Sequence, residues 1–174
     1  MPSAYRKTNN NLPTTSVFFG VKTTAQNIAS GASTMLTWVK KFSSDHLKQG
    51  SGSSLIIVDV NGAGWYKVRC RTTWAPNTTT AGYITLQLYK NAAAVADCLS
   101  RAYAAAVTTA YVNCNLDYIL YLSKGESVGI MATATTVQMN AQANYCSLLV
   151  EGITNQGWNN GEGGITRYDR LVQP

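Results

Sequence analysis

The ten residues WYKVRCRTTW, at positions 65–74, alternate between two kinds of side chain. One alternate row is uncharged and mainly apolar: Tyr66, Val68, Cys70 and Trp74. The row between them is basic: Lys67, Arg69 and Arg71. Because successive side chains of a β-strand point to opposite faces of a sheet, this pattern predicts a strand with one face in a core and a basic face turned away from it. The fold must therefore provide a sheet whose two faces have different surroundings.

The same alternation recurs in ITLQLYK (84–90) and in YVNCNLDYILYL (111–122). The first has the apolar row Ile84, Leu86 and Leu88. The second has the inner row Val112, Cys114, Leu116, Leu120 and Leu122. Between the apolar segments lie clusters of Gly, Asn, Ser and Thr: GAS (31–33), GSGSS (50–54), NGAG (61–64), PNTTTAG (76–82) and SKGES (123–127). Short strands separated by such turn residues predict an all-β sandwich or barrel.

A length of 174 residues suits one domain with its own core. Residues 1–16 include two prolines and three consecutive asparagines and offer little to a core. After Val150 the chain again becomes rich in Gly and Asn. We therefore expect an extended N-terminal arm over residues 1–16, one domain over residues 17–153 and a C-terminal tail over residues 154–174.

Two segments leave the choice between helix and strand open. TMLTWVKKFSSDHL (34–47) and NAAAVADCLSRAYAAAV (91–107) could both be helical on propensity, the second because of its alanines. Thr34 to Val39 also fits a strand, and the alanine-rich segment is followed by Thr108 and Thr109. We expect strands in both, since the rest of the chain predicts β-structure.

The second face of the segment at 111–122 predicts a contact surface. It reads Tyr111, Asn113, Asn115, Asp117, Ile119 and Tyr121, and it is apolar at both ends. Tyrosine is enriched where subunits meet, and the chain has ten tyrosines, more than one small core can bury. We expect Tyr111, Ile119 and Tyr121 to lie in a subunit interface. The alternative is that they are isolated exposed residues.

Composition restricts the partners of the chain. Charged residues make up 13% of it, about half of the usual share, which favours a surface that other subunits cover. The net charge is +6, but the basic residues are scattered and the N-terminal arm holds only Arg6 and Lys7. We therefore expect no direct binding to nucleic acid. The sequence shows neither a signal-peptide pattern nor a run of about 18 apolar residues, so we expect no membrane association and folding in a cytoplasm.

No motif indicates a cofactor, a metal or catalysis. The chain has four cysteines: Cys70, Cys98, Cys114 and Cys146. None of them is spaced as CxxC and His46 lies far from all of them in sequence, so we interpret them as small buried hydrophobic residues rather than zinc ligands. His46 has Asp45 and Ser44 beside it, but adjacent residues of an extended strand point to opposite faces, which argues against a catalytic triad. We expect no enzymatic activity and no cofactor.

The order of the segments resembles the C1q/TNF-like family. The matching segments are NIASGASTMLTWV (27–39), GWYKV (64–68), LQLYKNAAAVAD (86–97), YILYLSKGESVGIMA (118–132) and NYCSLLVEGI (144–153). The fourth is similar to the leucine strand, tight Lys-Gly-acid turn and valine strand of the family. Glu126 stands where Asp is more usual, and Cys146-Ser147-Leu148 where many members have Phe-Ser-Gly. The resemblance covers roughly residues 17–153.

This resemblance implies a ten-stranded antiparallel jelly-roll sandwich that usually trimerises. It places the row that contains Val68 and Cys70 in the sandwich core. It turns the basic row of Lys67, Arg69 and Arg71 outward or toward a trimer partner. The calcium site of some members needs a cluster of acidic residues that this sequence lacks.

The expected function follows from the same comparison. Animal relatives are secreted and often carry a collagen-like stalk, and this sequence has neither feature. Bacteriophages use compact β-sandwich trimers as head decoration or cement proteins. We therefore expect a virion protein, assembled in a host cytoplasm, whose homotrimer binds the major capsid protein or other virion proteins. The residues expected to dock onto the capsid are Tyr5, Arg6, Lys7, Trp158, Tyr168 and Arg170.

Two alternatives remain open at this point. One is the receptor-binding tip of a phage tail or head fibre, in which exposed loops such as WAPNTTTAG (74–82) would touch a cell-surface glycan or protein. The other is the jelly-roll coat protein of a small virus, which the weakly basic arm disfavours.

Overall fold

The computed structural model describes residues 16–59, 62–76, 80–106 and 110–153. These residues form thirteen strand segments and no helix. The described residues therefore contain no helix that could cross a membrane. All strand pairs are antiparallel. The prediction of an antiparallel jelly-roll sandwich is confirmed. Five of the thirteen segments are only three residues long, so the described residues form more and shorter segments than the ten strands expected.

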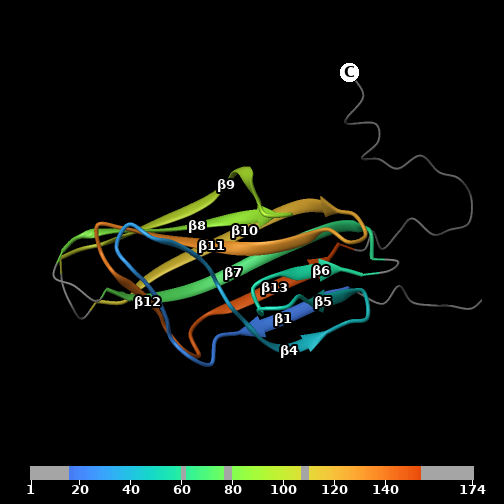
Figure 1. The fold of residues 1–174 in the computed structure, drawn as a ribbon, viewed down its shortest axis with the longest axis horizontal. Coiled ribbons are helices and arrows are strands. Elements are labelled where there is room, and N and C mark those ends of the chain that lie inside the picture. The colour runs from blue at the N-terminus through green and yellow to red at the C-terminus, as the bar shows by residue number, and fades with distance from the viewer. Residues whose placement is uncertain (1–15, 60–61, 77–79, 107–109, 154–174) are drawn as a thin grey trace, which may run out of the picture.

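The strands belong to two sheets, which Figure 1 shows as two layers along the long axis of the molecule. The first sheet has the order β2 (Gln26–Ile28), β12 (Met139–Ala141), β7 (Gly64–Pro76), β13 (Ser147–Gly152), β1 (Val17–Val21) and β4 (Val39–Ser43), with β10 (Val112–Leu122) paired to β7. The second has the order β5 (Leu47–Gln49), β6 (Ile56–Val58), β11 (Ser127–Thr135), β8 (Gly82–Lys90) and β9 (Ala93–Ala104), with β3 (Ser33–Met35) paired to β11.

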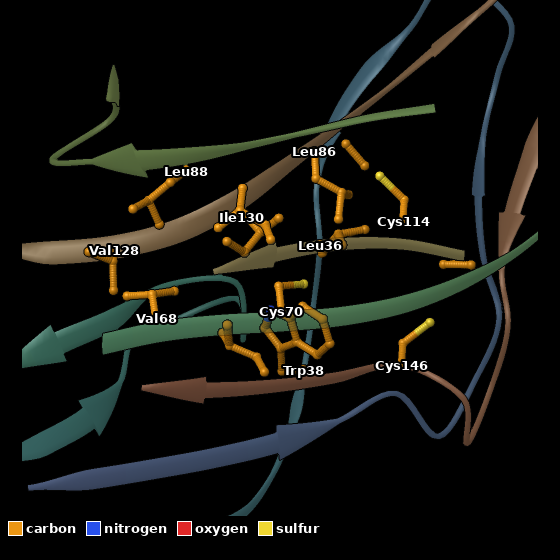
Figure 2. Packing of buried hydrophobic residues seen from close by; sticks show 14 of the residues in the cluster. Leu36, Trp38, Val68, Cys70, Leu86, Leu88, Cys114, Val128, Ile130 and Cys146 are labelled. Atoms are coloured by element: carbon orange, nitrogen blue, oxygen red, sulfur yellow. The ribbon is translucent and has the colours of Figure 1, made fainter. Parts of the chain in front are cut away.

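The core lies between the sheets and contains the apolar rows predicted from the sequence. Figure 2 shows side chains of both sheets converging on it. Its largest side chains, each less than 2% exposed, are Trp38, Trp74, Tyr66, Phe18, Ile28, Leu36, Leu47, Ile56, Ile84, Leu86, Leu88 and Leu122. Val112, at the start of β10, is only partly buried but packs against this core. The alternation in three segments thus identified the inner faces of β7, β8 and β10.

Thr72 is the polar exception in the inner row of β7. It is 2% exposed, and its hydroxyl Oγ1 donates to the carbonyl oxygen of Cys114. The same Oγ1 accepts a hydrogen bond of 2.7 Å from the indole Nε1 of Trp74. A buried polar group costs little free energy when its hydrogen bonds are made. Thr72 is therefore tolerated in the core because its hydroxyl accepts the hydrogen bond of the buried Trp74 indole N–H.

The alanine-rich segment forms a strand. Asn91 and Ala92 both have positive φ angles, 49° and 65°, and Lys90 pairs with Ala93. A two-residue loop with positive φ at both positions is the type I′ turn that joins antiparallel strands tightly. The turn directs β9 back along β8. Sheet pairing thereby outweighs the helix propensity of alanine. The segment at 34–47 likewise contains β3, β4 and the start of β5.

All four cysteines are free and buried in the core. Burial raises the pKa of each thiol, to about 11 for Cys98. A thiol with a raised pKa carries little thiolate near neutral pH and reacts slowly. The interpretation of these cysteines as buried hydrophobic residues agrees with their positions.

We expect the four thiols to be protected while the protein is folded. At pH 8 the native protein should show almost no reaction with 5,5′-dithiobis(2-nitrobenzoic acid), because the thiols are both inaccessible and protonated. The same protein in denaturant should release four equivalents of thionitrobenzoate at once. Rapid reaction of any cysteine in the native protein would contradict their burial in the core.

Gly82, at the start of β8, tests the packing of β8 against the end of β11 and the residues that follow it. A Cβ at this position would lie 2.2 Å from the carbonyl oxygen of Thr135 and 2.4 Å from Cγ1 of Val137. Gly82→Ala should therefore destabilise the fold by about 2–3 kcal/mol, at the upper end of the overpacking range. The measurement is the urea midpoint of unfolding. Gly64→Ala, at the start of β7 with nothing within 4 Å of its Cβ, is the control and should leave the midpoint unchanged or slightly raised.

Candidate subunit interface

The exposed side of the first sheet, here called the outer face, is built from the alternate residues that do not enter the core. Cross-strand pairing aligns them in rows across β10, β7, β13, β1 and β4. One row reads Asp117, Arg69, Leu149, Phe19 and Phe42. The next row reads Ile119, Lys67, Glu151 and Val17. The outer face thus combines apolar and charged side chains on one continuous sheet.

An aromatic cluster forms the end of the outer face where β7 begins and β10 ends. Trp65 and Tyr121 are cross-strand partners. Their rings are arranged edge to face, with the ring centroids 5.8 Å apart. Ile119 lies one row away, and Ile153 donates its backbone N–H to the carbonyl of Trp65. These side chains are between 40% and 55% exposed although all are large and apolar. Aromatic pairs of this kind are typical of residues that dominate binding energy in subunit contacts.

A second apolar region lies on β1 and β4. Phe19 and Phe42 are cross-strand partners and are 37% and 57% exposed. Leu149 of β13 adjoins Phe19 on its other side. Val39 adds another exposed aliphatic side chain on β4. Because β4 ends the strand order of the first sheet, this region reaches one edge of that sheet.

Charged residues cross the outer face between the two apolar regions. Arg69 Nε lies 2.9 Å from Oδ1 of Asp117, and a terminal guanidinium nitrogen of Arg71 lies 3.2 Å from Oδ2 of the same carboxylate. Lys67 and Glu151 are neighbours in the strand register. Three basic residues therefore face two acidic ones, which leaves a small positive excess. Each Arg–Asp pair is partly exposed, so by itself it adds little to the stability of a single chain.

The three residues predicted for an interface are all exposed: Tyr111 is 67% exposed, Ile119 52% and Tyr121 46%. The structure brings Ile119 and Tyr121 together with Trp65. It does not bring Tyr111 to them, because eight residues of strand place it about 27 Å from Ile119. Their role in a contact between subunits stays a prediction. The residues predicted to dock onto a capsid lie outside the described part of the chain.

Sequence reasoning missed Trp65, Phe19 and Phe42 as members of the outer face. Trp65 occupies the same alternate row as Lys67, and Phe19 directly follows the buried Phe18. Alternation alone could have assigned both side chains to the outer side of their strands. It could not have shown that β1 and β7 share a sheet through β13.

The described residues contain no group of three or more His, Cys, Asp or Glu side chains that could hold a metal ion. The outer face has the chemistry of a broad contact surface. Its exposed aromatic rings and its ion pairs can bind another protein surface.

Comparisons with known proteins show the fold. No protein-family model and no curated protein matches the chain in sequence. Among solved structures, murine APRIL at pH 5.0 superposes with a TM-score of 0.56 at 12% identity, covering 80% of this chain and 99% of that one. Murine APRIL at pH 8.0 and at pH 8.5 both give a TM-score of 0.55 at 14% identity with the same coverage. APRIL is a TNF-family jelly-roll protein, and the chain therefore has a TNF-like jelly-roll fold.

Proposed function

We propose that this chain is a structural virion protein that forms a homotrimer and decorates a phage head. The observation that carries the proposal is the outer face of the first sheet. Large apolar side chains such as Trp65, Ile119 and Phe42 are about half exposed on it. A single soluble chain rarely leaves so many on one sheet face unless another subunit covers them.

The fold supports self-association as the reason for this exposure. The C1q/TNF-like jelly roll, which the segments at 64–68 and 118–132 resemble, usually trimerises. The low share of charged residues, 13%, also suits a chain whose surface is partly covered by other subunits. A stable contact buries about 1,600 Å² in total, an area that one face of a seven-stranded sheet can supply.

The proposed mechanism of decoration is mechanical. A trimer presents each of its contact sites three times, so weak individual contacts to a capsid add up through multivalency. Contacts that span the junctions between capsomers oppose the separation of those capsomers when packaged DNA presses on the shell. In this proposal the arms at 1–16 and 154–174 contact the major capsid protein, and the outer face holds the trimer together.

The trimer is tested by a substitution on the outer face. Ile119→Arg introduces a charge that would be buried against a neighbouring subunit, so it should weaken association by about 2 kcal/mol or more. The wild-type chain should sediment with three times the mass of one chain, and the variant largely as a monomer at the same concentration. Leu99→Arg is the control, because Leu99 is equally exposed, at 54% against 52%, but lies on β9 of the second sheet.

Circular dichroism should show that both variants keep the β-fold. A wild-type chain that is monomeric at every concentration measured would contradict the proposal. A trimer that survives Ile119→Arg and is lost with Leu99→Arg would place the contact on the second sheet instead.

Head decoration is tested with capsids of the virus that encodes the chain. The full-length protein should cosediment with emptied, expanded heads and raise their thermal disruption temperature. Trp158→Ala, or the double change Arg6→Ala with Lys7→Ala, should reduce this binding while the trimer remains intact. Binding to host cells without binding to heads would favour a receptor-binding fibre tip and contradict decoration.

A further inference from the structure

Lys22 is a buried lysine outside the outer face. It directly follows β1 and is only 3% exposed. Its Nζ donates to Oε1 of Gln26 at 2.5 Å and to the carbonyl oxygen of Thr37 at 3.0 Å, with Oγ1 of Thr37 at 3.4 Å. Three acceptors match the three hydrogens of an ammonium group. All three acceptors are neutral, so the charge of Lys22 is solvated by dipoles alone.

No negative charge in the described part of the chain balances this lysine. None of the four ion pairs there includes Lys22. The neighbouring thiols of Cys146 and Cys70 do not supply an anion, because burial raises the pKa of both. The ring of Trp38, 5.8 Å from Nζ, offers a cation–π contact of modest strength. Burial accordingly lowers the pKa of Lys22, whereas buried charges in proteins are usually paired.

A hollow of about 270 Å³ adjoins the lysine. Its lining residues are Lys22, Thr23, Thr24, Thr37, Trp38, Val39, Gly52 and Ser53. Lys22 and Thr37, whose carbonyl oxygen accepts a hydrogen bond from Nζ, both belong to this lining. Four of the lining residues carry hydroxyl groups and none carries a carboxylate. In addition, the buried indole Nε1 of Trp38 has no hydrogen-bond partner among the described residues.

We propose that this hollow binds a small oxyanion, with the Lys22 ammonium group as its counter-charge. A carboxylate, phosphate or sulfate group supplies the missing negative charge and accepts hydrogen bonds from the hydroxyls of Thr23, Thr24 and Ser53. The hydroxyl of Thr37 already donates to Oε1 of Gln26. A cation is disfavoured by the lysine and by the lack of acidic residues. An apolar ligand would leave the charge of Lys22 as poorly compensated as before. Gln26 also accepts a hydrogen bond from the backbone N–H of Thr37 at 3.1 Å, so this polar cluster is held in place before any ligand arrives.

The binding is tested by thermal unfolding of the full-length protein in sodium phosphate, sulfate or acetate, with ionic strength held constant by sodium chloride. Phosphate and sulfate stabilise most proteins by exclusion, roughly in proportion to their concentration. Specific binding instead raises the Tm with the logarithm of anion concentration, by about 3–5 °C for each tenfold increase above the Kd. Lys22→Met should abolish the rise of the Tm with the logarithm of anion concentration. Lys40→Met, at an exposed lysine on β4, should keep this rise.

Two further measurements detect binding without a variant and identify the source of the anion. In the wild-type protein, backbone amide resonances of Thr23, Thr24, Gly52 and Ser53 should shift and saturate on titration with each anion, even if Lys22→Met does not fold. A short peptide with a free C-terminal carboxylate, compared with its amidated form, distinguishes a partner's carboxylate from inorganic phosphate or sulfate. The absence of saturable shifts with all of these probes, or a logarithmic Tm rise retained in Lys22→Met, would overturn the proposal.

Discussion

The antiparallel pairing of β7 is the interaction on which the rest of the structure depends. This strand pairs along its length with β10 on one side and with β13 and β12 on the other. Its inner row, from Tyr66 to Trp74, fills the core, and its outer row supplies Trp65 and the basic residues of the outer face. One strand therefore determines both what the sandwich buries and what it presents. Any shift of its register by one residue would exchange the two rows.

Strict alternation explains why the core was predictable. The rows of β7, β8 and β10 follow from the two-residue period of a strand, and their apolar members are buried as expected. Thr72 was not predicted as a core residue, because its place depends on the indole of Trp74 and the carbonyl of Cys114. A polar residue in an apolar row becomes acceptable only through partners that other strands bring to it.

The outer face could be predicted only in part, because its composition depends on which strands are neighbours. Ile119 and Tyr121 were predicted from the alternation within their own strand. Phe19 and Phe42 come from strands distant from β10 in sequence. They lie two and three strands beyond β7, on β1 and β4, which β13 connects to β7. The buried environment of Lys22 was also beyond prediction, because its acceptors lie on Gln26 and Thr37, where no sequence pattern points to a lysine site. Non-local pairing is the information that a single sequence conveys least well.

The charged residues on the outer face restrict the orientation in which a partner can bind to it. Apolar area alone attracts a neighbour in many orientations, since hydrophobic burial is not directional. Asp117 already bonds both Arg69 and Arg71 within one chain, so a neighbour can cover this cluster without leaving a bare carboxylate. The outer face keeps a small excess of positive charge, however. Burying an unpaired cation of a partner against it would therefore cost free energy. In the proposed contact between subunits, the aromatic cluster supplies affinity on one side of this charge, and the phenylalanines supply it on the other. The ion pairs between them then restrict which surfaces, and which orientations, the face accepts.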